Sequence, residues 1–304
     1  MRIDLLPSIL LQVVAPVVLI AGAGWLYGWR SEADPRPIAG LAFRVLTPCL
    51  VFTTLSGLEW GGSSVRLMAL FALLSMALQA VLAWLVGHLL HLEAPVSNAF
   101  LLVSVISNCG NLGLPLSLFA FGQEGLDLAL VYTMISLLLL SSVGVYVASR
   151  GRSGSWESRL SVVKAPVVWV AVLAMLVNLS GRDVPEFVGK PIELVGSGAL
   201  PVMLLILGIQ LSHLSLAESK RAIAAATFLR LAAAPVLAVA LAAFLGMQGV
   251  ARQVGILQAS MPAAVTAMIL AAEFDASPRF AAGAVFASTL LSLVSLTGLL
   301  VWLW

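Results

Sequence analysis

The sequence predicts an all-helical integral membrane protein with ten membrane-spanning helices, arranged as two inverted repeats of five helices. Three observations predict this fold class: the composition, the number of long apolar stretches, and helix-breaking residues at matching places in the two halves. Apolar residues make up 61% of the 304 residues, charged residues make up only 10%, and the mean hydropathy is +1.07. A typical soluble domain has about 45–50% apolar and about 25% charged residues. This chain has too few charged side chains to cover a soluble surface, and it is too apolar to be disordered.

Ten apolar stretches fit membrane-spanning helices, which need about 20 mainly apolar residues. Spans one to five are predicted at residues 7–28, 37–58, 66–90, 95–121 and 126–148. Spans six to ten are predicted at residues 165–179, 187–211, 222–245, 251–272 and 278–303. The chain therefore divides into a first repeat at 1–148, a polar, basic loop at 149–164 and a second repeat at 165–304.

The basic residues predict how the spans are oriented. Nine Lys and Arg residues lie in connections that follow odd-numbered spans, and five lie on the other side. The positive-inside rule places the larger set, with the loop at 149–164, in the cytoplasm. Both termini are then extracytoplasmic, and we expect a multi-pass protein of the cell inner membrane, surrounded by the lipid bilayer. The net charge of +2 gives no reason to expect a nucleic-acid partner.

The two halves resemble each other weakly at an offset of about 150 residues. Pro48 in span two corresponds to Pro201 in span seven, and Arg66 and Arg221 each open the third span of their half. Because five is an odd number of spans, the second half must enter from the opposite face, which makes the repeats inverted. Inverted repeats with broken helices near the midplane are typical of secondary transporters.

Spans four and nine carry helix-breaking residues in their middle. Two Asn, two Gly and one Pro lie from Ser107 to Pro115 in span four. Span nine has a weaker signal, the single Pro262 between Gln258 and Thr266, which alone is also compatible with a kink. Pro lacks a backbone N–H and clashes with the preceding turn, and Gly frees the backbone. The freed backbone groups must be buried in protein or line a cavity. We therefore expect both helices to break, so that four half-helix ends meet near the midplane.

The two breaks supply the candidate substrate or ion contacts. Helix N-termini present free N–H groups that suit anions, and helix C-termini present carbonyls that suit cations. The amides of Asn108 and Asn111 can serve either, because each has a carbonyl oxygen and two N–H donors. Their alternative role is structural, in satisfying the unwound backbone or joining neighbouring helices. The other candidates near the breaks, whose alternative role is packing, are Ser107, Gly113, Pro115, Thr133, Gln258, Pro262 and Thr266.

Arg230 lies about nine residues into span eight, near the bilayer centre, and corresponds at the repeat offset to Gln79 in span three. A central Arg costs about 2.5–3.5 kcal/mol on insertion scales, so we treat both positions as site candidates. Three roles are open for Arg230: it binds an anionic substrate, it replaces a cation at the carbonyl ends of the broken helices, or it snorkels to the cytoplasmic edge. No Asp or Glu lies at mid-span, so Na⁺ or H⁺ is left open as coupling ion, and the sequence implies no cofactor and defines no metal site.

Together these residues resemble the auxin efflux carrier family, in its bacterial branch, over nearly the whole chain. The matching motifs are Asn108-x4-Gly113-Leu114-Pro115-Leu116, Pro201-x6-Gly208, Arg230-x4-Pro235 and Gln258-x3-Pro262. The resemblance implies that helices four and nine cross, an architecture shared with bile-acid symporters and sodium–proton antiporters. It also implies secondary active transport of small organic anions, for which the bacterial relatives suggest dicarboxylates such as malonate. Spans three to five and eight to ten would move against the other four in an elevator-like motion.

The chain departs from the plant auxin carriers, so auxin itself is not expected as the substrate. Its loop at 149–164 is short, and Ser107 stands where the plant proteins have Pro before the crossover Asn. A sodium-coupled symporter of the bile-acid type is the alternative function, and a channel is a further one. An enzyme is not expected, because Gly-x-Ser-x-Gly, His-Glu-x-x-His and Gly-x4-Gly-Lys motifs are missing. A homodimer is left open as the oligomeric state.

Overall fold

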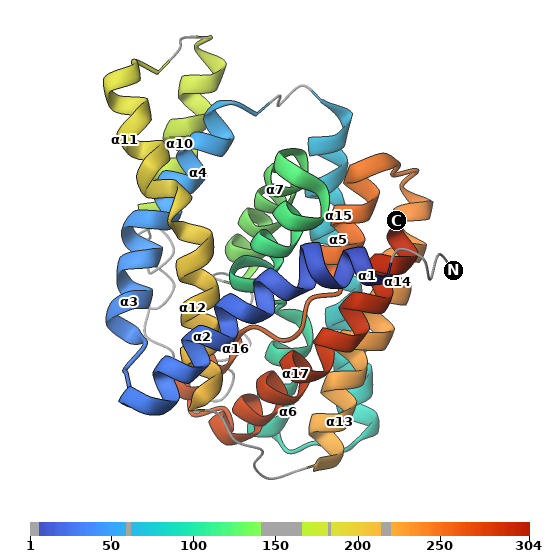
Figure 1. Cartoon of the computed structure of the whole chain (residues 1–304). Helices are drawn as coiled ribbons and strands as arrows, with labels where there is room; N and C mark the ends of the chain where they lie inside the picture. The colour runs from blue at the N-terminus through green and yellow to red at the C-terminus, as the bar shows by residue number, and fades with distance from the viewer. Residues whose placement is uncertain (1–5, 59–61, 141–165, 182–183, 214–219) are drawn as a thin grey trace.

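The computed structural model describes residues 6–58, 62–140, 166–181, 184–213 and 220–304 (Figure 1). In these ranges the regular structure is helical, apart from an isolated bridge between two residues. Seven helices are long and apolar enough to cross a membrane, which indicates a multi-pass membrane protein. The count of ten spans and the inversion of the repeats stay predictions. The loop predicted at 149–164 lies outside the described residues.

The helical elements follow the predicted spans closely. The first half contains α1 (Leu6–Ile9), η2 (Leu10–Val14), α2 (Ala15–Ser31), α3 (Arg36–Leu41), η3 (Ala42–Leu46), α4 (Thr47–Ser56), α5 (Ser63–Leu89), α6 (Ala94–Val105), η4 (Cys109–Gly113) and α7 (Leu114–Leu139). The second half contains α10 (Pro166–Leu179), α11 (Glu186–Ser197), α12 (Ala199–Ser212), α13 (Lys220–Phe228), η6 (Leu229–Ala233), α14 (Ala234–Phe244), α15 (Gly249–Ala259), α16 (Val265–Glu273) and α17 (Pro278–Leu303). Each η element is one π-helical turn that continues into a neighbouring α-helix.

Two helices differ in detail from the predicted spans. α7 continues past the turn predicted between spans four and five, but Gly122 interrupts it with a φ of 67° and a ψ of −156°. Only glycine adopts such a backbone without strain, so the predicted turn coincides with a sharp kink. Span seven is divided into α11 and α12 at Gly198. Pro201 has no N–H to donate to the Ser197 carbonyl, which weakens the helix at this point.

The π-helical turns have a common sequence cause. The four π turns that lie wholly within the described residues end two residues before a proline, namely Pro16, Pro48, Pro115 or Pro235. A proline inside a helix cannot donate to the carbonyl four residues back, and its ring crowds that carbonyl. One wider turn relieves this conflict, and such π-bulges are frequent at functional sites. The helices therefore continue through their prolines, and two of the π turns, η4 and η6, lie in the buried centre of the molecule.

The helices form two bundles that pack against each other (Figure 1). In the first bundle, α2 packs along α12, and α4 packs against α10 and α11. The second bundle contains α5, α6, α7 and α13 to α17. The α2–α12 contact is close because glycines form it: a Cβ at Gly208 would overlap the Ala21 carbonyl oxygen, and a Cβ at Gly24 would overlap that of Leu205. Each pairing in the first bundle joins one helix from each half of the chain.

α7 and its π turn lie at the centre of the protein. In the most apolar part of this helix 61% of residues are buried, against 22% in the helix Leu6–Ser31. The π turn η4 contacts α12 of the first bundle, and α7 contacts η2. The predicted break in span four is therefore where the two bundles meet.

Candidate functional site

Both predicted helix breaks are present, and they lie against each other. α6 ends at Val105 before η4 begins at Cys109, and α15 ends at Ala259 before α16 begins at Val265. Ser107 and Ala263 form an antiparallel bridge between the two breaks. The Asn108 amide donates to the Pro262 carbonyl (2.8 Å), and the Ala264 amide donates to the Ile106 carbonyl (3.0 Å). The crossover thus satisfies backbone groups that would otherwise be unpaired in an apolar interior.

Arg230 binds the carbonyl ends of both broken helices. Its Nη1 donates to Ser104 in the last turn of α6 (3.2 Å), and its Nη2 donates to Ala259 at the end of α15 (2.9 Å). Nε and Nη2 both donate to the Met261 carbonyl, the former at 3.0 Å. A cation at helix C-termini is stabilised by the helix dipoles, and charge-assisted hydrogen bonds are the stronger ones. Arg230 is 2% exposed, so it does not snorkel to the surface.

Gln79, the residue that corresponds to Arg230 at the repeat offset, lies beside it. Its Nε2 donates to the Leu229 carbonyl in the π turn η6 (3.1 Å), while its Oε1 is buried without a partner among the described residues. Both side chains border a cavity of about 10 Å³, which also touches Ser75 and Tyr132. This is room for about one water molecule. Tyr132 was missed from the sequence, although a buried hydroxyl on an apolar span is the kind of signal that marks such a site.

Asn108 presents an unused hydrogen-bond donor at the crossover. The residue is 4% exposed, and its Nδ2 is buried with no partner among the described residues. Its backbone carbonyl accepts from the Gly113 amide (3.0 Å), so the backbone is held while the side-chain amide is free. Asn111, which is 8% exposed, lies one turn further along in η4. Buried donors at the start of a helix suit a negatively charged group.

The other candidates divide into those that touch the crossover and those that pack beside it. Thr133 Oγ1 reaches the Cys109 carbonyl (3.4 Å) as well as that of Ala129 (2.8 Å). Gln258 is fully buried, and its Nε2 donates to Ser117 Oγ (3.0 Å) between α15 and α7. The structure therefore places Gln258 in a helix–helix contact. Thr266 is exposed. The remaining candidates are buried, namely Ser107, Gly113, Pro115 and Pro262.

Two polar residues that bind backbone groups of other helices were missed from the sequence. Ser288 on α17 accepts a hydrogen bond from the Ala263 amide (3.2 Å). Asn178, at the end of α10, donates from Nδ2 to the carbonyls of Ser56 (2.7 Å) and Leu58 (2.9 Å), just past α4. Both partners are far away in sequence, and no local pattern points to them.

The charges around the crossover favour an anion. Arg230 is the one charged side chain that is buried in the described parts of the chain. Those parts also contain no group of three His, Cys, Asp or Glu residues that could hold a metal ion. A buried positive charge and the unpaired N–H donor of Asn108 suit a carboxylate or another small anion.

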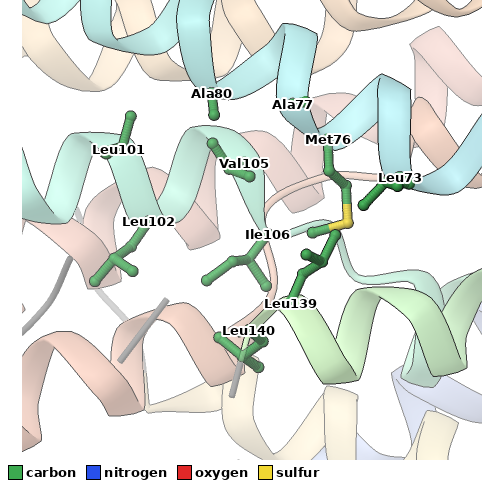
Figure 2. Close-up of a pocket in the computed structure, with 10 residues that line it drawn as sticks. All are labelled: Leu73, Met76, Ala77, Ala80, Leu101, Leu102, Val105, Ile106, Leu139 and Leu140. Carbon is green, nitrogen blue, oxygen red and sulfur yellow. The ribbon is translucent and has the colours of Figure 1, made fainter. Parts of the chain in front are cut away.

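A second cavity beside the crossover is apolar. Figure 2 shows its lining from α5, α6 and the end of α7, including Leu73, Met76, Val105 and Ile106. It has a volume of about 210 Å³, and every described residue that lines it is hydrophobic. Met76 and Val105 separate it from the polar cavity at Arg230. It offers no group that could bind an anion, so the candidate site stays at the crossover.

The chain is similar to known membrane transport proteins over most of its length. The family model described as "Membrane transport protein" matches residues 9–300. An uncharacterized transporter of Methanothermobacter thermautotrophicus is 28% identical over 291 residues, which cover 94% of this chain and 95% of the relative. An uncharacterized transporter of Methanocaldococcus jannaschii is 24% identical over 297 residues, which cover 95% of this chain and 96% of the relative. The similarity therefore spans both bundles and the crossover.

Proposed function

Since the chain belongs to the membrane transport protein family, which is the family of the auxin efflux carriers, we propose that it is a secondary active transporter of small organic anions. The proposed binding site is the crossover of the two broken helices. The observation that carries this proposal is the buried, unpartnered Nδ2 of Asn108 at the start of η4. A buried donor without an acceptor is costly unless a ligand or water supplies one.

The packing of the helices supports the inverted repeats. Span one packs on span seven as α2 on α12, and span six packs on span two as α10 on α4. In an inverted repeat, span one corresponds to span six and span two corresponds to span seven. Rotation about a two-fold axis that relates the two halves therefore converts the first of these contacts into the second. The two backbone bonds of the Ser107–Ala263 bridge exchange in the same way. Ten spans result when each broken helix is counted across its break and α7 is divided at Gly122.

The two bundles are the bodies of the proposed elevator-like motion. The first bundle is formed by spans one, two, six and seven, and it is locked by glycine contacts between α2 and α12. The second bundle carries the crossover and Arg230. Movement of the second bundle against the first would carry the bound anion across the membrane. In this proposal Arg230 takes the position of a coupling cation at the helix ends, so binding of the anion needs no Na⁺.

Thermal unfolding of the purified protein in detergent tests the proposal. The ligands are malonate, malate and indole-3-acetate, each with Na⁺ or with K⁺. A ligand at 100 times its Kd adds about 2.7 kcal/mol to the folded state. We expect one of these anions to raise the Tm equally in both salts, and we expect Asn108→Ala to lose the shift. Asn98→Ala, on α6 before the break, is the matched control and should keep it.

Two results would contradict the proposal. A Tm shift of the same size in Asn108→Ala as in the wild type would show that the anion does not bind at the crossover. A shift produced by Na⁺ alone, or by an anion only when Na⁺ is present, would favour the sodium-coupled symporter instead.

A further inference from the structure

A cavity of about 540 Å³ separates the two bundles on one face of the molecule. We call it the vestibule. α4, α11 and α12 line it from the first bundle, and α7 lines it from the second near the Gly122 kink. Its polar lining consists of Thr53, Thr54, Ser56, Gln123, Glu193 and Ser197. A volume of this size is typical of sites for small molecules.

Most of the donors in this lining are already used. Thr53 Oγ1 donates to carbonyls of its own helix, those of Cys49 (3.1 Å) and Leu50 (3.0 Å). Ser56 Oγ donates to the Thr53 carbonyl (3.2 Å), and Ser197 Oγ donates to a carbonyl three residues back (2.7 Å). A hydroxyl has one proton but two lone pairs. These side chains therefore offer acceptors, not donors, to a molecule in the vestibule.

Glu193 adds a full negative charge to this acceptor-rich surface. It is exposed on α11, and it is the one charged residue that lines the vestibule within the described residues. Glu186 on the same helix differs, because its carboxylate is paired with Lys190 (2.7 Å). The crossover and the vestibule thus have opposite character: the first presents donors and a positive charge, and the second presents acceptors and a negative charge.

We propose that the vestibule is the face from which the anion is released, because Glu193 and the acceptor-rich lining lower the affinity for anions there. The inference rests on the proposed function. The orientation predicted from the basic residues makes this face extracytoplasmic, so the asymmetry favours export. This difference between the two faces changes the apparent affinity for the anion at each face. It leaves the equilibrium distribution of the anion across the membrane unchanged. A charge at this range changes the local concentration of a monovalent anion about 2- to 10-fold, less at high salt.

Cysteine labelling measures the electrostatic potential in the vestibule and needs no transported substrate. The reporter is Ser197→Cys in a background of Cys49→Ser and Cys109→Ala, labelled with cationic and anionic methanethiosulfonate reagents. We expect the cationic reagent to react faster, and we expect Glu193→Gln to reduce the ratio of the two rates at least about 4-fold at low salt. Glu186→Gln is the matched control and should leave the ratio unchanged. An unchanged ratio in Glu193→Gln, with the reporter labelled, overturns the inference and leaves the proposed function standing.

Transport in proteoliposomes tests the consequence for the anion. With malonate as the probe, Glu193→Gln should lower the KM about 2-fold or more from the vestibule face, with little change from the opposite face. The effect should be larger for malonate than for indole-3-acetate, because the energy scales with ligand charge. An equal KM in Glu193→Gln and wild type overturns the inference. The absence of anion transport by the wild type would instead overturn the proposed function.

Discussion

Replacing Arg230 by Met removes the hydrogen bonds that hold the two broken helices at their C-terminal ends. Met fills part of the space but leaves the carbonyls of Ser104, Ala259 and Met261 without their donor. An unpaired buried polar group costs about 1–3 kcal/mol, so three carbonyls give about 3–9 kcal/mol. The adjacent cavity of about 10 Å³ can admit a water that restores some of these bonds. We therefore expect the lower part of the range, about 3–6 kcal/mol of destabilisation.

Thermal unfolding in detergent measures this loss through the fluorescence of the eight Trp residues. At about 2–4 °C for each kcal/mol, the Tm should fall by about 6 °C or more. Arg230→Lys keeps the charge and three donors, so it should lose less. Arg36→Met is the control, because that side chain is 91% exposed with its Nε 3.9 Å from Asp34, and it should change stability by at most about 1 kcal/mol. Equal Tm values for Arg230→Met and wild type would refute the assigned role of the guanidinium.

Two further predictions concern close contacts of glycines. Gly208→Ala places a Cβ on the Ala21 carbonyl oxygen, so it should destabilise the fold by about 1–3 kcal/mol. Gly40→Ala is the control, because a Cβ there meets no other atom, and it should not destabilise the fold. Equal unfolding midpoints for the two variants would contradict the close α2–α12 contact. Gly113→Ala collides with the end of the Gln258 side chain, so the double variant Gly113→Ala/Gln258→Ala should be more stable than Gly113→Ala alone. Additive losses in that double-mutant cycle would show that the two residues do not meet.

The features that the sequence predicted best have a local cause. The break at Ser107 follows from nearby glycines and a proline, the break at Pro262 follows from that proline, and both breaks are present. The π turns have the same origin, since the proline alone creates the conflict that widens the turn before it. The position of Arg230 was predicted because an isolated charge in an apolar span needs partners.

The features that could not be predicted depend on which helices meet. Asn178 and Ser288 bind backbone groups more than 20 residues away, and nothing near either residue identifies the partner. Gln258 was expected to be a site residue because it precedes Pro262, but its hydrogen bond to Ser117 depends on the packing of α15 on α7, which nothing near Gln258 indicates. Sequence spacing gives the place of a side chain along a helix, but the neighbouring helix decides what it contacts.

The exchange of helices between the two halves sets the order in which the protein can be made. α2 needs α12, α4 needs α10, and the break at Ser107 needs Ala263, so the first half leaves the ribosome without any of these partners. Its glycine face and its open break must remain in the lipid until the second half has been inserted. α17, which follows the crossover in the chain, brings Ser288 to the Ala263 amide and packs against α1. The crossover is therefore complete only after α17 has been inserted, and a chain that stops before α17 leaves it without one of its supports.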